Sequence, residues 1–93
     1  MRSELKRALG AALKSYRLKR NISQENMGPS QPYISNLEGG RWSASLDKIE
    51  QMATVLGVHP VSVILAGYLT TEEDANTDEV LARIRSELRE IGV

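Results

Sequence analysis

Side chains with amide and hydroxyl groups gather between residues 23 and 36 of this chain. Gln24 follows a serine that can begin a short helix, and Gln31 begins the next helix, with Asn36 one turn further along. A glutamine amide carries a donor and an acceptor side by side, which match the N6 and N7 atoms of adenine. The same residues can also be solvated polar groups at helix starts. The secondary structure predicted around them therefore has to distinguish base contact from simple solvation.

Catalytic chemistry is poorly supported by the residue types present. The chain has no cysteine, which excludes disulfides, thiolate chemistry and zinc–sulfur sites, and it has a single histidine, His59. His59 precedes Pro60 at a predicted helix start, where we expect it to cap the helix. The sequence has no glycine-rich phosphate loop after a predicted strand, and 93 residues are too few to enclose a substrate pocket readily. We therefore expect no enzyme, with no catalytic residue, no metal site, no cofactor and no small-molecule effector.

Charge is unevenly distributed along a chain whose formal net charge is zero. Residues 1–48 carry nine basic and four acidic side chains, whereas residues 49–93 carry three basic and eight acidic ones. Net neutrality alone argues against a polyanionic partner, but this asymmetry indicates a basic contact surface joined to an acidic segment. No apolar run approaches the ~18 residues of a membrane span, and the charged N-terminus lacks the apolar core of a signal peptide. We expect a cytoplasmic protein with no membrane partner.

Every periodic segment has helical spacing, which predicts an all-α fold. Helices are expected over residues 2–20, 31–38, 46–56, 60–66 and 78–91, with one short helix after Ser23. Asn21 is expected to end the first helix, Ser30 and Ser45 to cap the next ones, and Gly67 to stop the fourth. Residues 70–77 are polar and acidic and are predicted to form a hinge. The buried face of the 46–56 helix is predicted to comprise Leu46, Ile49, Met52, Ala53 and Leu56.

Two short helices joined by the turn around Gly28-Pro29 have the outline of a helix-turn-helix. The second helix of such a motif must be slim and polar where it enters the DNA major groove, yet apolar behind. Residues 30–38 fit that requirement, since Ile34 and Leu37 fall on one face. Gln31, Asn36 and Pro32 or Ser35 fall on the other.

The stretch from Leu9 to Leu65 resembles the Cro/CI/Xre-type helix-turn-helix regulators, over about 57 of the 93 residues. The elements that carry the resemblance occur in the family's order: Ile22-Ser23-Gln24-Glu25, Gly28-Pro29-Ser30, Tyr33-Ile34-Ser35-Asn36-Leu37-Glu38-Gly39-Gly40, Ser45-Leu46 and Ala53-Thr54-Val55-Leu56-Gly57-Val58. The resemblance implies a five-helix Cro/CI-like (lambda repressor-like) domain over residues 1–69. An acidic linker and a C-terminal helix follow over residues 70–93.

One segment departs from the family pattern. Between Gln24 and Ser30 the chain is about four residues shorter than in the family, close to one helical turn. The alanine and leucine that usually pack the first helix of the motif are missing there. Either that helix is a single turn, of 3₁₀ type, or Met27 and Pro29 replace the lost apolar contacts.

The resemblance also implies roles for individual side chains at a DNA surface. Gln24 would bond a phosphate and brace Gln31, whereas Pro32 would touch a thymine methyl or shape the turn. Tyr33 and Trp42 have packing as the alternative to phosphate contact. Arg17 and Glu38 would form a structural ion pair. The expected base readers are Gln31, Pro32, Ser35 and Asn36, and the expected phosphate contacts are Gln24, Ser30, Tyr33, Arg41, Trp42 and Ser43.

The last predicted helix has an apolar face that either pairs with a second copy or folds back on its own domain. We favour the dimer contact, because the upstream helices already supply a core. The sequence then predicts a sequence-specific double-stranded DNA-binding transcriptional regulator that acts as a homodimer on a palindromic operator. The alternative is an antitoxin-like DNA-binding protein whose acidic C-terminal segment neutralises a protein partner. The dimerisation face comprises Val80, Leu81, Ile84, Leu88 and Ile91.

Overall fold

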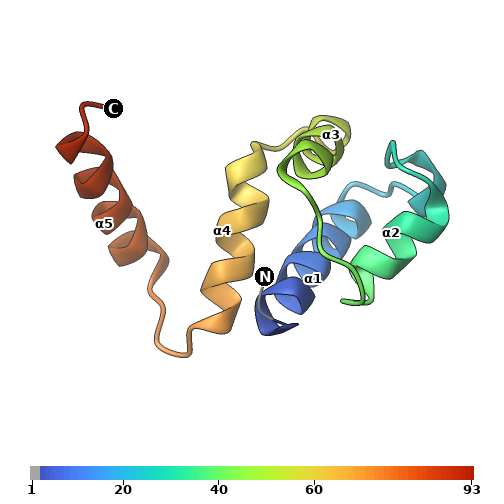
Figure 1. The fold of residues 1–93 in the computed structure, drawn as a ribbon, viewed down its shortest axis with the longest axis horizontal. Helices are drawn as coiled ribbons and strands as arrows, with labels where there is room; N and C mark the ends of the chain where they lie inside the picture. The colour runs from blue at the N-terminus through green and yellow to red at the C-terminus, as the bar shows by residue number, and fades with distance from the viewer. Residues whose placement is uncertain (1–2) are drawn as a thin grey trace.

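A computed structural model describes residues 3–93, which fold entirely into helices and connecting turns (Figure 1). The elements in chain order are α1 (Ser3–Lys19), the 3₁₀ turn η1 (Gln24–Asn26), α2 (Gln31–Glu38), α3 (Leu46–Leu56), α4 (Pro60–Thr71) and α5 (Thr77–Glu90). The predicted all-α class is confirmed. The predicted start of the first helix at residue 2 lies outside the described residues.

Helix α1 lies at the centre of the domain and packs against α4 on one side and α2 on the other (Figure 1). Its stripe of Leu5, Leu9 and Leu13 is buried, because the spacing of these leucines places them on one helix face. Burying each such side chain stabilises the fold by about 1.5–3 kcal/mol relative to leaving it exposed. The buried core consists of Leu5, Leu9, Leu13, Met27, Ile34, Leu37, Ile49, Met52, Leu56 and Val63.

Three helix ends are formed by the residues that the sequence predicts for them. Asn21 follows α1 in the left-handed conformation, with φ 54°, and its short polar side chain tolerates that geometry. The Ser45 hydroxyl accepts a hydrogen bond from the Lys48 N–H at 3.2 Å. His59 caps α4, since its Nδ1 accepts from the Val61 N–H at 3.1 Å. These residues fix where α1 ends and where α3 and α4 begin.

Two predicted features of α3 and α4 are wrong. Gly67 does not stop α4, which continues to Thr71, so that the segment between α4 and α5 comprises only residues 72–76. A Cβ at Gly67 would lie 2.7 Å from Cδ2 of Leu9, so this glycine allows α4 to approach α1 closely. Leu46 is not part of the buried face of α3 but is 72% exposed, because it occupies the first turn at the rim of the domain.

Helix α5 stands away from the rest of the domain (Figure 1). None of its residues is buried, and only Val80 and Ile84 on it are partly covered. Within residues 3–93, no single helix is both long and apolar enough to cross a membrane. The pair α3 and α4 meets that length and composition only when counted together, across a bend of 108°.

Candidate nucleic-acid interface

The helix-turn-helix is built from η1, the Gly28-Pro29 turn and α2 (Figure 1). Its first helix is a single 3₁₀ turn, as one of the two predicted alternatives required. The other alternative also holds, because Met27 is fully buried and Pro29 is buried beside it. A flexible methionine side chain can fill the irregular gap that a lost helical turn leaves behind. The shortened element is therefore packed despite its length.

Helix α2 presents one apolar and one polar face. Ile34 and Leu37 are 1% and 2% exposed, and both belong to the core. The Ser30 hydroxyl accepts a hydrogen bond from the Tyr33 N–H at 3.4 Å, and Pro32 lies within the first turn, where its missing N–H costs nothing. On the opposite face Pro32 is exposed and Gln31, Ser35 and Asn36 are partly exposed. This division between the two faces is the one the sequence predicts.

A chain of hydrogen bonds runs from the end of α1 to the start of α2. Nε and Nη2 of Arg17 donate to the two carboxylate oxygens of Glu38, at 2.7 and 2.9 Å. Glu38 also accepts a hydrogen bond from Nε2 of Gln24 at 3.0 Å. The Oε1 atom of Gln24 in turn accepts from Nε2 of Gln31 at 2.7 Å. The structure thus brings together the two residues expected to pair and the two glutamines expected to brace one another.

The ion pair lies largely out of water, with side-chain exposures of 10% for Arg17 and 5% for Glu38. The hydrogen bond to Glu38 raises the pKa of Arg17, although burial acts in the opposite direction. A third hydrogen bond, from Nη1 of Arg17 to the Ile22 carbonyl oxygen at 2.9 Å, ties the end of α1 to the segment before η1. The pair therefore holds α1, η1 and α2 in one fixed arrangement.

Two aromatic side chains and a basic one pack together beside α2. The rings of Tyr33 and Trp42 lie 5.7 Å apart between centroids, tilted by 55°. Nζ of Lys48 lies 5.6 Å from the centroid of the Tyr33 ring, within the range of a cation–π contact. Burial raises the pKa of Tyr33. Trp42 remains 46% exposed, and Ser43 next to it is exposed as well.

Two residues near this surface escaped the sequence reasoning. Lys48 has no sequence signal beyond its charge, although its position on α3 brings it over Tyr33. Gly10 sits in the middle of α1, where a Cβ would overlap the carbonyl oxygen of Leu37. This close approach lets α2 lie against α1. The only sequence signal for it is a glycine inside an otherwise strongly helical pattern.

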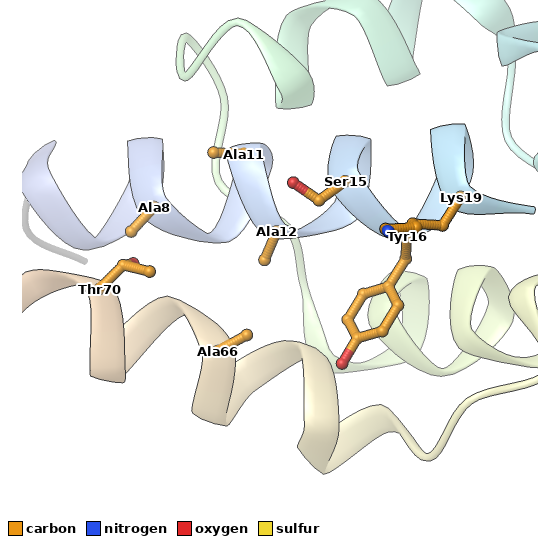
Figure 2. A pocket seen from close by; sticks show the side chains of 8 residues that line it. All are labelled: Ala8, Ala11, Ala12, Ser15, Tyr16, Lys19, Ala66 and Thr70. Carbon is orange, nitrogen blue, oxygen red and sulfur yellow. The ribbon is translucent and has the colours of Figure 1, made fainter. Parts of the chain in front are cut away.

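A separate groove of about 380 Å³ lies between α1 and α4 (Figure 2). Its lining is mostly small, with Ala8, Ala11, Ala12, Ser15, Tyr16, Lys19, Ala66 and Thr70. In Figure 2, α1 separates this groove from α2. The lining contains no carboxylate, thiol or imidazole. Within residues 3–93, no three His, Cys, Asp or Glu side chains converge in a way that could hold a metal ion.

Residues 8–63 match a protein family described as a helix-turn-helix domain. The chain belongs to this family of helix-turn-helix domains. Over 66 residues it is 32% identical to a "Neisseria hypothetical transcription factor" of Neisseria meningitidis serogroup B. That match spans 67% of this chain and 62% of the Neisseria protein, which is less than two thirds of the relative's length.

Two crystal structures of the clp gene regulator ClgR from Corynebacterium glutamicum resemble this helix-turn-helix protein. One superposes with a TM-score of 0.68 at 28% identity, covering 75% of this chain and 96% of ClgR. The other has a TM-score of 0.63 at 25% identity and covers 94% of this chain and 88% of ClgR. Since the second match leaves only 6% of this chain uncovered, it includes at least part of α5.

Proposed function

We propose that this protein is a sequence-specific double-stranded DNA-binding transcriptional regulator that acts as a homodimer on a palindromic operator. One observation carries the proposal: the outward face of α2 begins with an amide, Gln31, that Gln24 and Glu38 brace from behind. Such bracing is what a reading helix needs, because a base contact discriminates only when its donor and acceptor are fixed in position. In this proposal residues 1–69 bind DNA, and residues 70–93 link and dimerise.

The proposed base-reading face comprises the outward residues of α2. Gln31 uses one amide N–H toward Gln24, which leaves its Oε1 and its second N–H for an adenine edge. Pro32 and Ser35 supply an apolar contact and a hydroxyl on the same face. Replacing Gln31 with alanine is expected to cost about 1–3 kcal/mol of discrimination at one base pair. Binding selection from a random duplex library measures this, and an unchanged preference for Gln31→Ala would rule out Gln31 as a reader. The face consists of Gln31, Pro32, Ser35 and Asn36.

The proposed phosphate contacts surround that face and supply the affinity that depends on salt. Tyr33 and Trp42 carry a hydroxyl and an indole N–H on the flank of α2, and Arg41 adds a positive charge beside them. Each neutralised phosphate contributes roughly one to the slope of log affinity against log salt. Measuring that slope for Arg41→Ala tests the cationic member of the set, since a true cationic phosphate contact lowers the slope when it is removed. The uncharged members are expected to weaken binding on alanine substitution without changing the slope. The set comprises Gln24, Ser30, Tyr33, Arg41, Trp42 and Ser43.

The proposed dimer interface is the apolar face of α5. Leu81 and Leu88 are 40% and 41% exposed and Ile91 is 74% exposed, which leaves a helix face uncovered in the single chain. On a palindromic operator, the α2 helices of such a dimer are expected to lie about one DNA turn apart, ~34 Å. Light scattering of a chain ending at Thr71 is expected to show a monomer. A dimer of undiminished affinity would exclude α5. The face comprises Val80, Leu81, Ile84, Leu88 and Ile91.

An antitoxin-like role is the second candidate, favoured by the same uncovered face of α5 beside the acidic segment of residues 72–79. In that case α5 would bind another protein while the first domain binds DNA. Co-purification of a stoichiometric protein partner through α5 would support it. A chain that purifies alone as a stable homodimer through α5 would exclude it.

A further inference from the structure

The side chain of Arg41 turns back over the C-terminal end of α2. Its Nε donates to Oδ1 of Asn36 at 2.7 Å, and its Nη2 donates to the carbonyl oxygen of Ser35 at 3.1 Å. The guanidinium is therefore held along one edge, from Nε to Nη2. The group lies on the polar face of α2 although Arg41 itself belongs to the loop that follows.

The two glycines that follow α2 leave space for the Arg41 guanidinium against the end of that helix. A Cβ at Gly39 would lie 2.5 Å from Nη1 and 2.8 Å from Cζ of Arg41, so any other residue there would displace the side chain. Gly40 has φ +75°, which turns the chain back toward α2. The carbonyl oxygen of Asn36 accepts hydrogen bonds from the backbone N–H groups of Arg41 and Trp42, at 3.0 and 3.3 Å.

Both the oxygen and the nitrogen of the Asn36 side-chain amide already form hydrogen bonds within the protein. Its Oδ1 accepts from Arg41, and its Nδ2 donates to the carbonyl oxygen of Pro32 at 2.8 Å. A bidentate contact from an asparagine to an adenine needs that same donor and acceptor together. As arranged here, Asn36 cannot make such a contact without releasing Arg41.

We propose that Asn36 is a positioning residue that acts through Arg41, and that Arg41 makes the DNA contact at this end of α2. The inference rests on the proposed DNA-binding function and deepens it, and it replaces the direct base contact proposed above for Asn36 with an indirect role. The remaining edge of the guanidinium, between Nη1 and Nη2, has no hydrogen-bond acceptor within residues 3–93. That edge presents parallel N–H groups to a pair of acceptors, which on DNA are two phosphate oxygens or the O6 and N7 atoms of guanine.

The test is a double-mutant cycle with the full chain, using a duplex that the wild type selects from a random-sequence library. Asn36→Ala and Arg41→Ala are each expected to weaken binding by roughly 5- to 150-fold, as a bidentate contact requires. The double variant is expected to bind no more weakly than Arg41→Ala, because Asn36 has no contact of its own. The matched control is Lys14→Ala, an exposed charge on α1. The loss of binding in the double variant Lys14→Ala/Asn36→Ala is expected to equal the product of the two single losses.

Two further measurements distinguish a phosphate contact of Arg41 from a guanine contact. If Arg41 contacts a phosphate, Arg41→Ala lowers the salt slope by about one and keeps the base preference. If it reads guanine, the selected site loses its preference at one base pair. The inference is overturned if the losses of Asn36→Ala and Arg41→Ala multiply, or if Arg41→Ala binds like the wild type.

A readout without DNA separates this inference from the proposed function. In heteronuclear NMR of the free protein, the Nε–H of Arg41 is expected to exchange slowly with water, and Asn36→Ala is expected to remove that protection. Retained protection in Asn36→Ala would refute the positioning role. If no duplex is enriched by the wild type, the proposed function fails, whereas the NMR result still reports on the contact.

Discussion

Replacing Glu38 with glutamine tests the hydrogen-bond chain at its centre. The carboxylate accepts hydrogen bonds from Nε and Nη2 of Arg17 and from Nε2 of Gln24, at 2.7, 2.9 and 3.0 Å. Glutamine has nearly the same shape, but it carries no charge and replaces one acceptor oxygen with an NH₂ group. That NH₂ group would face a donor of Arg17 or of Gln24. The substitution thus removes the charge and misplaces a donor while leaving the packing in place.

The magnitude follows from burial. Arg17 is 10% exposed at its side chain, so Glu38→Gln leaves a guanidinium largely out of water without the carboxylate that it contacts. Removing one partner of a buried pair costs about 3–5 kcal/mol. Since a domain of this size is stable by only about 5–15 kcal/mol, the loss is a large share of the total. Replacing both residues, as in Arg17→Met/Glu38→Leu, is expected to recover part of the loss, because no unpaired charge is then buried.

Urea denaturation followed by circular dichroism measures these changes, and the chain provides its own control. Arg83 and Glu87 form an ion pair at 3.2 Å whose side chains are 79% and 54% exposed. The same carboxylate-to-amide change, Glu87→Gln, is expected to cost only about 0.3–0.5 kcal/mol. If Glu38→Gln and Glu87→Gln proved equally mild, the Arg17–Glu38 pair would not be buried in solution, and the reasoning would be wrong.

Three further substitutions probe the packing and caps around α2. Gly10→Ala is expected to destabilise the fold by about 1–3 kcal/mol despite better helix propensity, because its Cβ would overlap the Leu37 carbonyl; a gain in melting temperature would contradict this. Burial raises the pKa of Tyr33, so its phenol ionises at a higher pH in the folded state than in the unfolded state, and folding stability falls as the pH rises through the folded pKa. The ultraviolet difference titration between wild type and Tyr33→Phe should therefore show a late ionisation. Ser45→Ala is expected to cost about 1 kcal/mol in denaturation by removing the hydroxyl that caps the Lys48 N–H, and no loss would mean that water replaces it.

Helix positions and caps followed from the sequence because their causes are local. Ser45 caps α3 and Asn21 ends α1 through interactions within three or four residues, so the residue type alone indicates the outcome. The polar face of α2 was predictable for the same reason. Ile34 and Leu37 are three residues apart and share a face wherever the helix is placed.

The errors arose where a distant element decides what a residue does. Gly67 lies inside α4, where Leu9 of α1 occupies the space that a side chain would fill. A glycine at such a close helix crossing has the same sequence context as a glycine at a helix end. Leu46 fits the apolar stripe of α3 but extends past the edge of the core. The contact between Arg41 and Asn36 was beyond sequence reasoning as well, since it depends on the turn that Gly39 and Gly40 make.

The hydrogen-bond chain links the stability of this fold to the order of its polar face. Arg17 at the end of α1 fixes Glu38 at the end of α2, Glu38 fixes Gln24, and Gln24 fixes Gln31. A side chain already held in place avoids an ordering cost of about 0.5–1.5 kcal/mol when it binds. Substitution of Glu38 therefore has two effects. It lowers stability by leaving the buried Arg17 charge without its carboxylate, and it frees the Gln31 amide on the outward face of α2. A variant that refolds around a lost Glu38 would still lack the fixed Gln31, so recovered stability need not restore binding to a DNA site.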